Sequence, residues 1–453
     1  MANPTLAMIP SGYKAGKVYS VLPVNGDGDF STFTRAGQAT RVNQSGFIET
    51  VEANVPRLDY TNGGCPVLLL EGQSTNQLTR SEDFNNWTKL NITTTTNTKI
   101  SPIGDLSADT ITRNSTAASY VNKTFTKEDE DSFEMTLSVF VKKNVGDFFA
   151  IRAQGTYPNR VDSLFQFSNE TFTSSEAGSN FSFISASFKK YTNDWYRLDV
   201  SFETDEAETL TSLFSARSSS GSVDVPTDSS SDSSVFIWGA QCEYDNLSSY
   251  IKTTTSAQTR LKETCKDSGN IVLFGGQGHI DLLNSLRLRS TYFENLQGTT
   301  EILNSFLCNG VYPYGSTMFV DLQKTFKDTS NGRISISDSS TLNRVVISKQ
   351  TNNTQFKLFI SRANGDVVSE ITTNVDYNVR NKIAISWEIN NFKFYVNGVL
   401  VHTDTSGGIP IDLNAMAFNG SNSGINNFFG EINQVQYYNT ALTNSEAQIL
   451  TTI

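Results

Sequence analysis

The side chains most able to do chemistry in this 453-residue chain are two histidines, four cysteines and scattered carboxylates. His279 and His402 lie in neither a nucleophile-elbow pattern nor an HExxH pattern. Those patterns place a base beside a nucleophile or put two imidazoles on one zinc ion, so neither a catalytic triad nor a zincin site is expected. Both histidines are expected to be ordinary surface or loop residues.

The cysteines Cys65, Cys242, Cys265 and Cys308 lie far apart and form no CxxC pair. This spacing does not predict a structural zinc site. It favours buried thiols in a protein made in a reducing cytoplasm. A contact between Cys65 and Cys265 stays open, because both flank the central part of the chain.

The densest acidic run is residues 128–131, Glu-Asp-Glu-Asp. Like charges this close stay in water, which indicates a solvated turn. A glycosidase needs only two carboxylates that meet in the fold, so a glycosidase stays as an alternative. The glycine-rich residues 275–278 lead into no Lys-Ser/Thr pair and predict no phosphate-binding loop. We therefore predict no catalytic residues.

One segment has the composition of a calcium loop. Asn25, Asp27 and Asp29, separated by Gly26 and Gly28, place three oxygen-bearing side chains in five residues, and hard cations prefer oxygen ligands. The segment lacks the twelfth-position Glu of an EF-hand, and a plain turn is the alternative. Otherwise no cofactor or metal is predicted.

The charge pattern bears on the partners of the chain. The formal net charge is −11 and no window is dense in Lys and Arg, so binding to nucleic acid is not expected. No stretch approaches the roughly 18 apolar residues of a transmembrane helix, and the start, Met1–Pro4, lacks a basic region typical of a secretion signal. We therefore expect synthesis in the cytoplasm, and we expect no insertion into a membrane.

Composition and alternation predict an all-β fold. Aromatic residues make up 11% of the chain and charged residues only 18%. From Phe133 to Val141, and again from Tyr196 to Glu203, apolar and polar residues alternate, which is typical of strands with one buried face. Asn397-Gly398 between two apolar runs predicts a two-residue hairpin turn. The spacing of Ile432 and Val435 predicts a β-bulge.

We expect two antiparallel β-sandwich (jelly-roll) domains preceded by an extended N-terminal arm. Residues 1–35, punctuated by Gly and Pro, form the arm, for attachment or oligomerisation. The first sandwich spans residues 36–260 and the second spans residues 266–453, after a polar break near Thr253. Thr443 and Glu446 predict a capping box and a short terminal helix.

A series of short motifs runs in order through residues 35 to 260. They are Arg35–Asn43, Gly46–Glu49, Val55–Tyr60, Leu69–Glu71, Ser74–Asn76, Ser81–Trp87, Val235–Gln241, Ser249–Ile251 and Thr253–Thr254. This series resembles a module common in structural proteins of tailed bacteriophages and prophages. The resemblance implies a jelly roll like that of carbohydrate-binding modules, and it implies no reaction.

A second group of motifs lies in the C-terminal part. They are Phe394–Gly398, Gly430–Ile432 with Val435, Tyr437–Asn439, and Ala441–Leu442 before Ser445–Glu446. This part resembles a concanavalin A-like, laminin-G-type sandwich. Members that hydrolyse glucans carry their acids as an ExDxxE strand, which is absent here. That departure argues against glycanase activity.

Together these resemblances imply a non-enzymatic virion protein, an exposed head or tail fibre or a decoration component, with host-surface glycans as the expected ligand. Tyr312 and Tyr314 are the candidate sugar-stacking residues, although sandwich aromatics are usually core residues. A polysaccharide-degrading tail enzyme and a purely architectural capsid or tail protein stay as alternatives.

Repeated weak sites gain avidity, so a homo-oligomer is expected, and the family analogy suggests a trimer. The N-terminal arm is expected to bind other virion proteins, with the C-terminal sandwich at the distal end.

Overall fold

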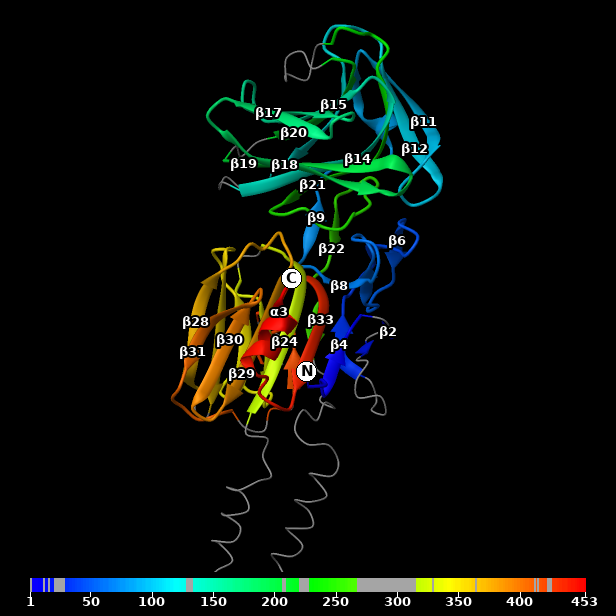
Figure 1. Ribbon diagram of the computed structural model, residues 1–453. Helices are drawn as coiled ribbons and strands as arrows, with labels where there is room; N and C mark the ends of the chain where they lie inside the picture. Colours follow the sequence, from blue (N-terminus) through cyan, green and yellow to red (C-terminus); the bar gives the residue numbers. More distant parts are fainter. Residues whose placement is uncertain are drawn as a thin grey trace, which may run out of the picture.

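The computed structural model describes residues 2–10, 13–14, 17–19, 29–127, 133–205, 209–219, 228–266, 315–327, 330–362, 365–410, 413, 415–421 and 426–453. These residues form two β-sandwiches with antiparallel strand pairing, connected by short strands (Figure 1). The predicted all-β, jelly-roll class is confirmed. In the described part of the chain, no helix has the length and apolarity needed to cross a membrane.

The central sandwich consists of two six-stranded sheets that face each other across an apolar core. Its short 3-10 turns are η1 (Phe84–Asn86) and η2 (Thr192–Asp194). One sheet has the order β10 (Thr88–Leu90), β13 (Tyr120–Thr126), β20 (Thr209–Arg217), β15 (Phe148–Gln154), β16 (Arg160–Gln166) and β17 (Thr171–Ala177). The other has the order β11 (Ile92–Ile100), β12 (Leu106–Arg113), β21 (Ser234–Tyr244), β14 (Phe133–Val145), β19 (Trp195–Thr204) and β18 (Phe181–Tyr191).

The C-terminal sandwich pairs a sheet of eight strands with a sheet of five. The larger sheet has the order β31 (Val399–Asp404), β30 (Asn391–Val396), β29 (Asn381–Glu388), β24 (Gly315–Thr325), β33 (Gly430–Tyr438), β8 (Val67–Leu70) and β7 (Arg57–Asp59), with β1 (Leu6–Met8) also on β33. The smaller sheet has the order β28 (Asp366–Asn374), β27 (Gln355–Arg362), β26 (Arg344–Lys349), β25 (Arg333–Ser337) and β32 (Ala415–Ala417).

Three small sheets complete the fold, and the four-stranded one packs on the C-terminal core through Val18, Phe33 and Cys265. The three sheets are β2 (Tyr13–Lys14), β3 (Lys17–Tyr19), β4 (Asp29–Thr34) and β23 (Thr264–Lys266); β9 (Ser74–Asn76) with β22 (Gln258–Arg260); and the hairpin β5 (Ala39–Val42) and β6 (Ile48–Val51). In Figure 1, β9 and β22 lie between the two sandwiches.

Local features predicted from the sequence are confirmed in the C-terminal sandwich. Val396 pairs with Val399, and Asn397 and Gly398 have φ values of 50° and 80°, as a two-residue hairpin turn requires. In β33, Asn433 is the extra residue of a bulge, because Asp321 pairs with Gln434 and Leu322 with Ile432. The terminal helix α3 (Asn444–Thr451) begins with the predicted capping box of Thr443 and Glu446.

The structure does not follow the predicted domain boundaries. β1 pairs with β33, and Leu6 and Met8 lie in the core of the C-terminal sandwich. The expected arm of residues 1–35 is therefore not a free extension in its described part. β7 and β8, predicted for the first sandwich, also belong to the C-terminal sheet, because the apolar run Val67–Leu70 pairs with β33.

These pairings also change the expected arrangement of the chain ends. The backbone nitrogen of Ala2 donates to a carboxylate oxygen of Glu446 at 3.1 Å, and both termini lie on the C-terminal sandwich (Figure 1). The expectation that the N-terminal segment and the C-terminal sandwich lie at opposite ends of the molecule is wrong.

Strand β14 also departs from its predicted one-sided burial. Met135 and Leu137 face the main core as expected, but the alternate residues Thr136, Ser138 and Phe140 are buried as well. A second apolar cluster covers this outer face, where Phe140 packs with residues of β5, β6, β19, β21 and the segment after β21. Its buried members are Val42, Ile48, Ala108, Phe140, Trp195, Trp238 and Tyr250.

We expect Gly239→Ala to destabilise the central sandwich by about 1–3 kcal/mol. Gly239 forms a bulge in β21 with a φ of +64°, and an added Cβ would lie 2.9 Å from the Phe140 ring and 3.2 Å from the Tyr250 ring. Urea denaturation of the full chain measures this change. Gly37→Ala is the matched control, because nothing lies within 4 Å of its Cβ position. Equal stability of the two variants would contradict this account.

Candidate functional site

The residues that connect the two sandwiches form a buried ion network, which we call the junction network: Arg35, Arg57, Glu71, Arg260 and Glu263. The Glu263 carboxylate accepts hydrogen bonds from Arg35 Nη1 at 2.7 Å, from Arg57 Nε at 2.8 Å and Nη2 at 2.5 Å, and from the Glu71 backbone nitrogen at 2.8 Å. Arg35 also donates to the backbone oxygens of Gly37, Val51, Glu52 and Val55. Segments far apart in the sequence are thereby held together.

Glu71 links this network to the loop after β21. Its Oε1 accepts from the backbone nitrogen of Ser249 at 2.8 Å, and its Oε2 accepts from the Ser249 hydroxyl at 2.7 Å. Burial alone would raise the pKa of Glu71, but the charges of Arg260 and Arg57 and the hydrogen bonds from Ser249 lower it to about 2. The carboxylate is therefore ionised throughout the physiological range.

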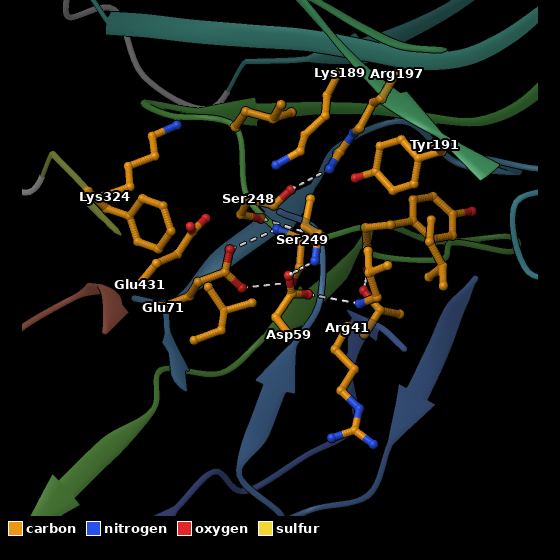
Figure 2. Close-up of a pocket in the computed structure, with 18 residues that line it drawn as sticks. Arg41, Asp59, Glu71, Lys189, Tyr191, Arg197, Ser248, Ser249, Lys324 and Glu431 are labelled. Carbon is orange, nitrogen blue, oxygen red and sulfur yellow. Dashed lines mark hydrogen bonds between the residues drawn. The ribbon is translucent and has the colours of Figure 1, made fainter. Parts of the chain in front are cut away.

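Beside the network lies a cavity of about 130 Å³, the junction cavity, which is lined by both sandwiches (Figure 2). Lys189 and Arg197 come from β18 and β19 of the central sandwich, and Glu431 comes from β33. Lys324, on β24, also lines it, and the Lys324 ammonium lies 5.8 Å from the Phe326 ring centre. The cavity therefore exists only when both sandwiches are folded and docked.

The amide of Asn62 joins the two sandwiches at this cavity. It accepts from Lys189 Nζ at 2.9 Å and donates to Glu431 Oε2 at 2.9 Å. Burial lowers the pKa of Lys189 and raises the pKa of Glu431, although each charge opposes the shift of the other. Asp59 is occupied by main-chain donors, since its two oxygens accept from the nitrogens of Val42 and Thr61 at 2.8 Å each.

A second and larger hollow, of about 510 Å³, adjoins this cavity; we call it the side groove. Tyr191, Val42 and Thr61 line both hollows. The side groove is lined by hydroxyl, amide, aromatic and ammonium groups and by glycines. Its residues are Val42, Gln44, Ser45, Gly46, Tyr60, Thr61, Gly63, Gly64, Lys190, Tyr191 and Thr192. Its volume falls in the range of small-molecule sites, whereas that of the junction cavity does not.

Local structure fixes the shape of the side groove. The Tyr60 carbonyl accepts from the Gly63 nitrogen at 2.8 Å, and Gly63 and Gly64 have φ values of 70° and 68°. Nothing lies within 4 Å of a Cβ added at either glycine, so this turn leaves the groove open. Opposite it, the Tyr191 ring packs edge-on against Phe140 at 5.1 Å, and burial raises the pKa of its hydroxyl to about 12. The Tyr191 hydroxyl is therefore neutral at physiological pH, and the packed ring forms a rigid aromatic side of the groove.

The side chains predicted from the sequence as ligand sites are not among those that the structure describes. Tyr312, Tyr314, Asn25 and Asp27 lie outside the described residues, and for Asp29 only the backbone, at the start of β4, is described. Among the described residues, no group of three or more His, Cys, Asp or Glu could hold a metal ion. Cys65 is an exposed thiol without a disulfide, so it does not pair with Cys265, which lies in the C-terminal core.

His402 lies on β31 and is not in a loop. Its ring packs against Phe394 at 5.1 Å, and its Nε2 lies 3.1 Å from the Ser369 hydroxyl. It belongs to the packing of the C-terminal sandwich and is no part of the candidate site.

Comparison with known proteins assigns the C-terminal part. Residues 323–448 match the family model described as the concanavalin A-like lectin/glucanases superfamily. This part of the C-terminal sandwich is similar to concanavalin A-like, laminin-G-type domains. No curated protein sequence matches the chain significantly.

Matches among solved structures have TM-scores below 0.3, and they include carbohydrate-binding domains. The CBM40 domain of the Ruminococcus gnavus IT-sialidase, bound to α2,3-sialyllactose, matches with a TM-score of 0.27 and 16% identity over 31% of this chain and 84% of that one. Domain 4 of an extracellular arabinanase from Geobacillus stearothermophilus, in complex with arabinotriose, matches with a TM-score of 0.26 and 17% identity over 31% of this chain and 68% of that one. The leech intramolecular trans-sialidase matches at 0.28 and 13%, over 31% of this chain and 24% of that one.

Proposed function

We propose that this chain is a non-enzymatic glycan-binding protein, displayed on a bacteriophage particle as a fibre or decoration component. The observation that carries the binding part is the side groove, where Tyr60 and Tyr191 stand among hydroxyl and amide groups in about 510 Å³. A sugar ring offers an apolar face to an aromatic side chain and hydroxyls to polar groups, and this groove provides both. The lectin-like class of the C-terminal domain is consistent with this role.

Polysaccharide cleavage is the second candidate, and one observation favours it. Burial raises the pKa of Glu431, as a general acid requires, and Asp59 lies near enough to add to that shift. Against it, both Asp59 oxygens are held by main-chain nitrogens, and the cavity of about 130 Å³ is below the usual size of a ligand site. Binding without cleavage is therefore the better account.

We expect Tyr60→Ala to weaken binding of the full chain to host-surface polysaccharide about tenfold, because the ring supplies stacking that alanine cannot replace. A glycan array followed by calorimetry on the best ligand measures this loss. Tyr157→Ala is the matched control, because Tyr157 is 69% exposed and does not line the groove. Equal losses in both variants would remove the groove from the proposal.

Product analysis on the same polysaccharide separates the two candidates. Intact polymer after incubation is expected, whereas cleavage that disappears in Glu431→Gln would establish the enzyme. The full chain must be used, because a fragment starting at residue 266 would lack β1, β7 and β8 of the C-terminal sheet.

The virion part of the proposal is supported by the resemblance of residues 35–260 to tailed-phage structural proteins. We propose a homo-oligomer, with a trimer as the working number, attached to other virion proteins through the N-terminal segment. Mass spectrometry of purified particles is expected to find the chain, and multi-angle light scattering gives its oligomeric state. A chain found only in the soluble lysate would contradict display on the particle.

A further inference from the structure

The five-stranded sheet of the C-terminal sandwich has an unusual outer face. Side chains alternate between the two faces of a strand. Ile334, Ile336, Val345 and Ile347 lie in the core, so the residues next to them in β25 and β26, and the corresponding residues of β27, face outward. Outward positions of a sheet that faces water are usually polar and exposed. Here many of them are buried; they include Ser335, Val346, Ser348, Phe359 and Ser361.

Two arginines lie on this face without an acidic partner in the described part of the chain. Arg333 begins β25 and Arg344 begins β26. Arg344 Nη1 donates to the backbone oxygen of Gly420 at 2.7 Å, but its Nε has no acceptor, and the buried Nε of Arg333 has none either. We call these two residues the arginine pair.

A third cation completes the cluster. The Phe359 ring lies 6.0 Å from the Arg333 guanidinium carbon, 5.3 Å from that of Arg344 and 5.8 Å from the Lys357 ammonium. Lys357 forms an ion pair with Glu370 at 2.7 Å. Among the described residues, one carboxylate therefore neutralises one of three clustered cations, and the charge of the arginine pair is left uncompensated there.

This arrangement is costly for an empty protein. Burial lowers the pKa of Arg333, and burial together with the charge of Arg333 lowers the pKa of Arg344 to about 10. Charges withdrawn from water are normally paired, because desolvation is otherwise unopposed. Clustered, partly buried guanidinium groups with free N–H groups are the arrangement that binds carboxylate, sulfate or phosphate groups.

Two buried neutral donors that find no acceptor among the described residues lie beside the arginine pair. Ser361 is the direct cross-strand neighbour of Arg344, is 2% exposed, and its hydroxyl has no hydrogen-bond partner. Asn419 precedes the Gly420 that accepts from Arg344; it is fully buried, and its side-chain nitrogen has no acceptor. These donors are buried and supply no acceptor to the free Nε groups of the arginine pair, whereas the partly exposed guanidinium groups of Arg333 and Arg344 are within reach of an oxyanion from outside.

We propose that the arginine pair binds an oxyanion group of an acidic polysaccharide. The inference deepens the proposed glycan binding, but it uses a site that shares no residue with the side groove. The net charge of −11 repels polyanions from the molecule as a whole, so their binding requires a local site of this kind. The class of ligand is thereby an acidic glycan and not a neutral one.

The test uses the full chain with three immobilised polymers at physiological salt: polygalacturonate, dextran sulfate and neutral dextran. Binding to at least one polyanion is expected, and its identity separates a carboxylate from a sulfate. Arg344→Gln and Arg333→Gln should each weaken that binding about 10- to 100-fold, since each removes charge-assisted hydrogen bonds. Arg344→Lys should give an intermediate loss, because it keeps the charge without the guanidinium fork.

Arg362→Gln is the matched control, because Arg362 is an exposed arginine at the end of the same strand as Phe359. Its binding should equal that of the unaltered chain. Absence of binding to both polyanions would overturn the inference, as would an equal loss in Arg362→Gln. A failure of the side groove is distinguishable, because Tyr60→Ala would then leave all glycan binding unchanged while the arginine variants still lose polyanion binding.

The arginine variants should also fold. Removing one of two repelling, desolvated charges should leave the thermal midpoint equal or higher. Polygalacturonate or dextran sulfate should raise the midpoint of the unaltered chain and of Arg362→Gln, and should raise it less in the single arginine variants. A polyanion-induced shift that persists in Arg333→Gln/Arg344→Gln would contradict the assignment.

Discussion

Replacing Glu263 by glutamine is expected to lower the free energy of unfolding by about 3–5 kcal/mol, the usual cost of breaking a buried ion pair. The Glu263 side chain is fully buried and accepts from Arg35, Arg57 and the Glu71 backbone. The amide of glutamine would lose the negative charge and place an N–H group against an arginine. Both arginines would then be buried with too little compensation.

Guanidinium denaturation with intrinsic tryptophan fluorescence measures this loss. Glu49→Gln is the matched control, because Glu49 pairs with Arg41 at 2.7 Å but its side chain is 35% exposed. A surface pair contributes at most about 1 kcal/mol. Glu263 bonds to the segments that connect the two sandwiches, so a protease should cleave these connecting segments faster in Glu263→Gln than in the unaltered chain. Similar losses for the two variants would show that the junction network does not stabilise the fold.

The second large effect is the pH dependence that comes from Glu71. Its folded-state pKa of about 2 lies below the ordinary value of 4.5. A lowered carboxyl pKa stabilises the folded state above the unfolded pKa, and this stabilisation is lost as the pH falls from about 4.5 towards 2. A shift of this size corresponds to about 3 kcal/mol, of which about 2 kcal/mol should be gone at pH 3.

The contribution is isolated by comparing the unaltered chain with Glu71→Gln at pH 6 and at pH 3. The stability difference between the two proteins should shrink by about 2 kcal/mol at the lower pH. Asp109 acts in the opposite direction, because burial raises its pKa to about 6, but it is present in both proteins and cancels. A difference that is independent of pH would mean that the pKa of Glu71 is the same in the folded and unfolded states, which would contradict this account.

Much of the local structure could be predicted from the sequence because local chemistry determines it. The Asn397-Gly398 turn, the bulge at Asn433 and the capping box at Thr443 each depend on a few neighbouring residues. The assignment of β1, β7 and β8 to the C-terminal sheet could not be predicted in this way. Alternation and apolar runs identify a strand, but they do not identify which distant strand it will pair with.

The candidate site was harder to predict. Arg57, Asp59, Glu71 and Ser249 belong to motifs that carry the phage resemblance, and the structure places them around the junction. These motifs therefore mark how the segments connect. Tyr191, in contrast, has no local signal, because its position beside the side groove depends on the docking of β18 against the hairpin of β5 and β6.

The pairing of β8 with β33 has a consequence for the newly made chain. Leu69 leaves the ribosome long before its partner Glu431 is synthesised. At 5–20 residues per second, the apolar run Val67–Leu70 waits roughly 20 to 70 seconds for the strand that covers it. The central sandwich, whose strands all lie between these two, can fold during that interval. A prematurely terminated chain would retain an uncovered apolar strand, a ready substrate for chaperones or for aggregation.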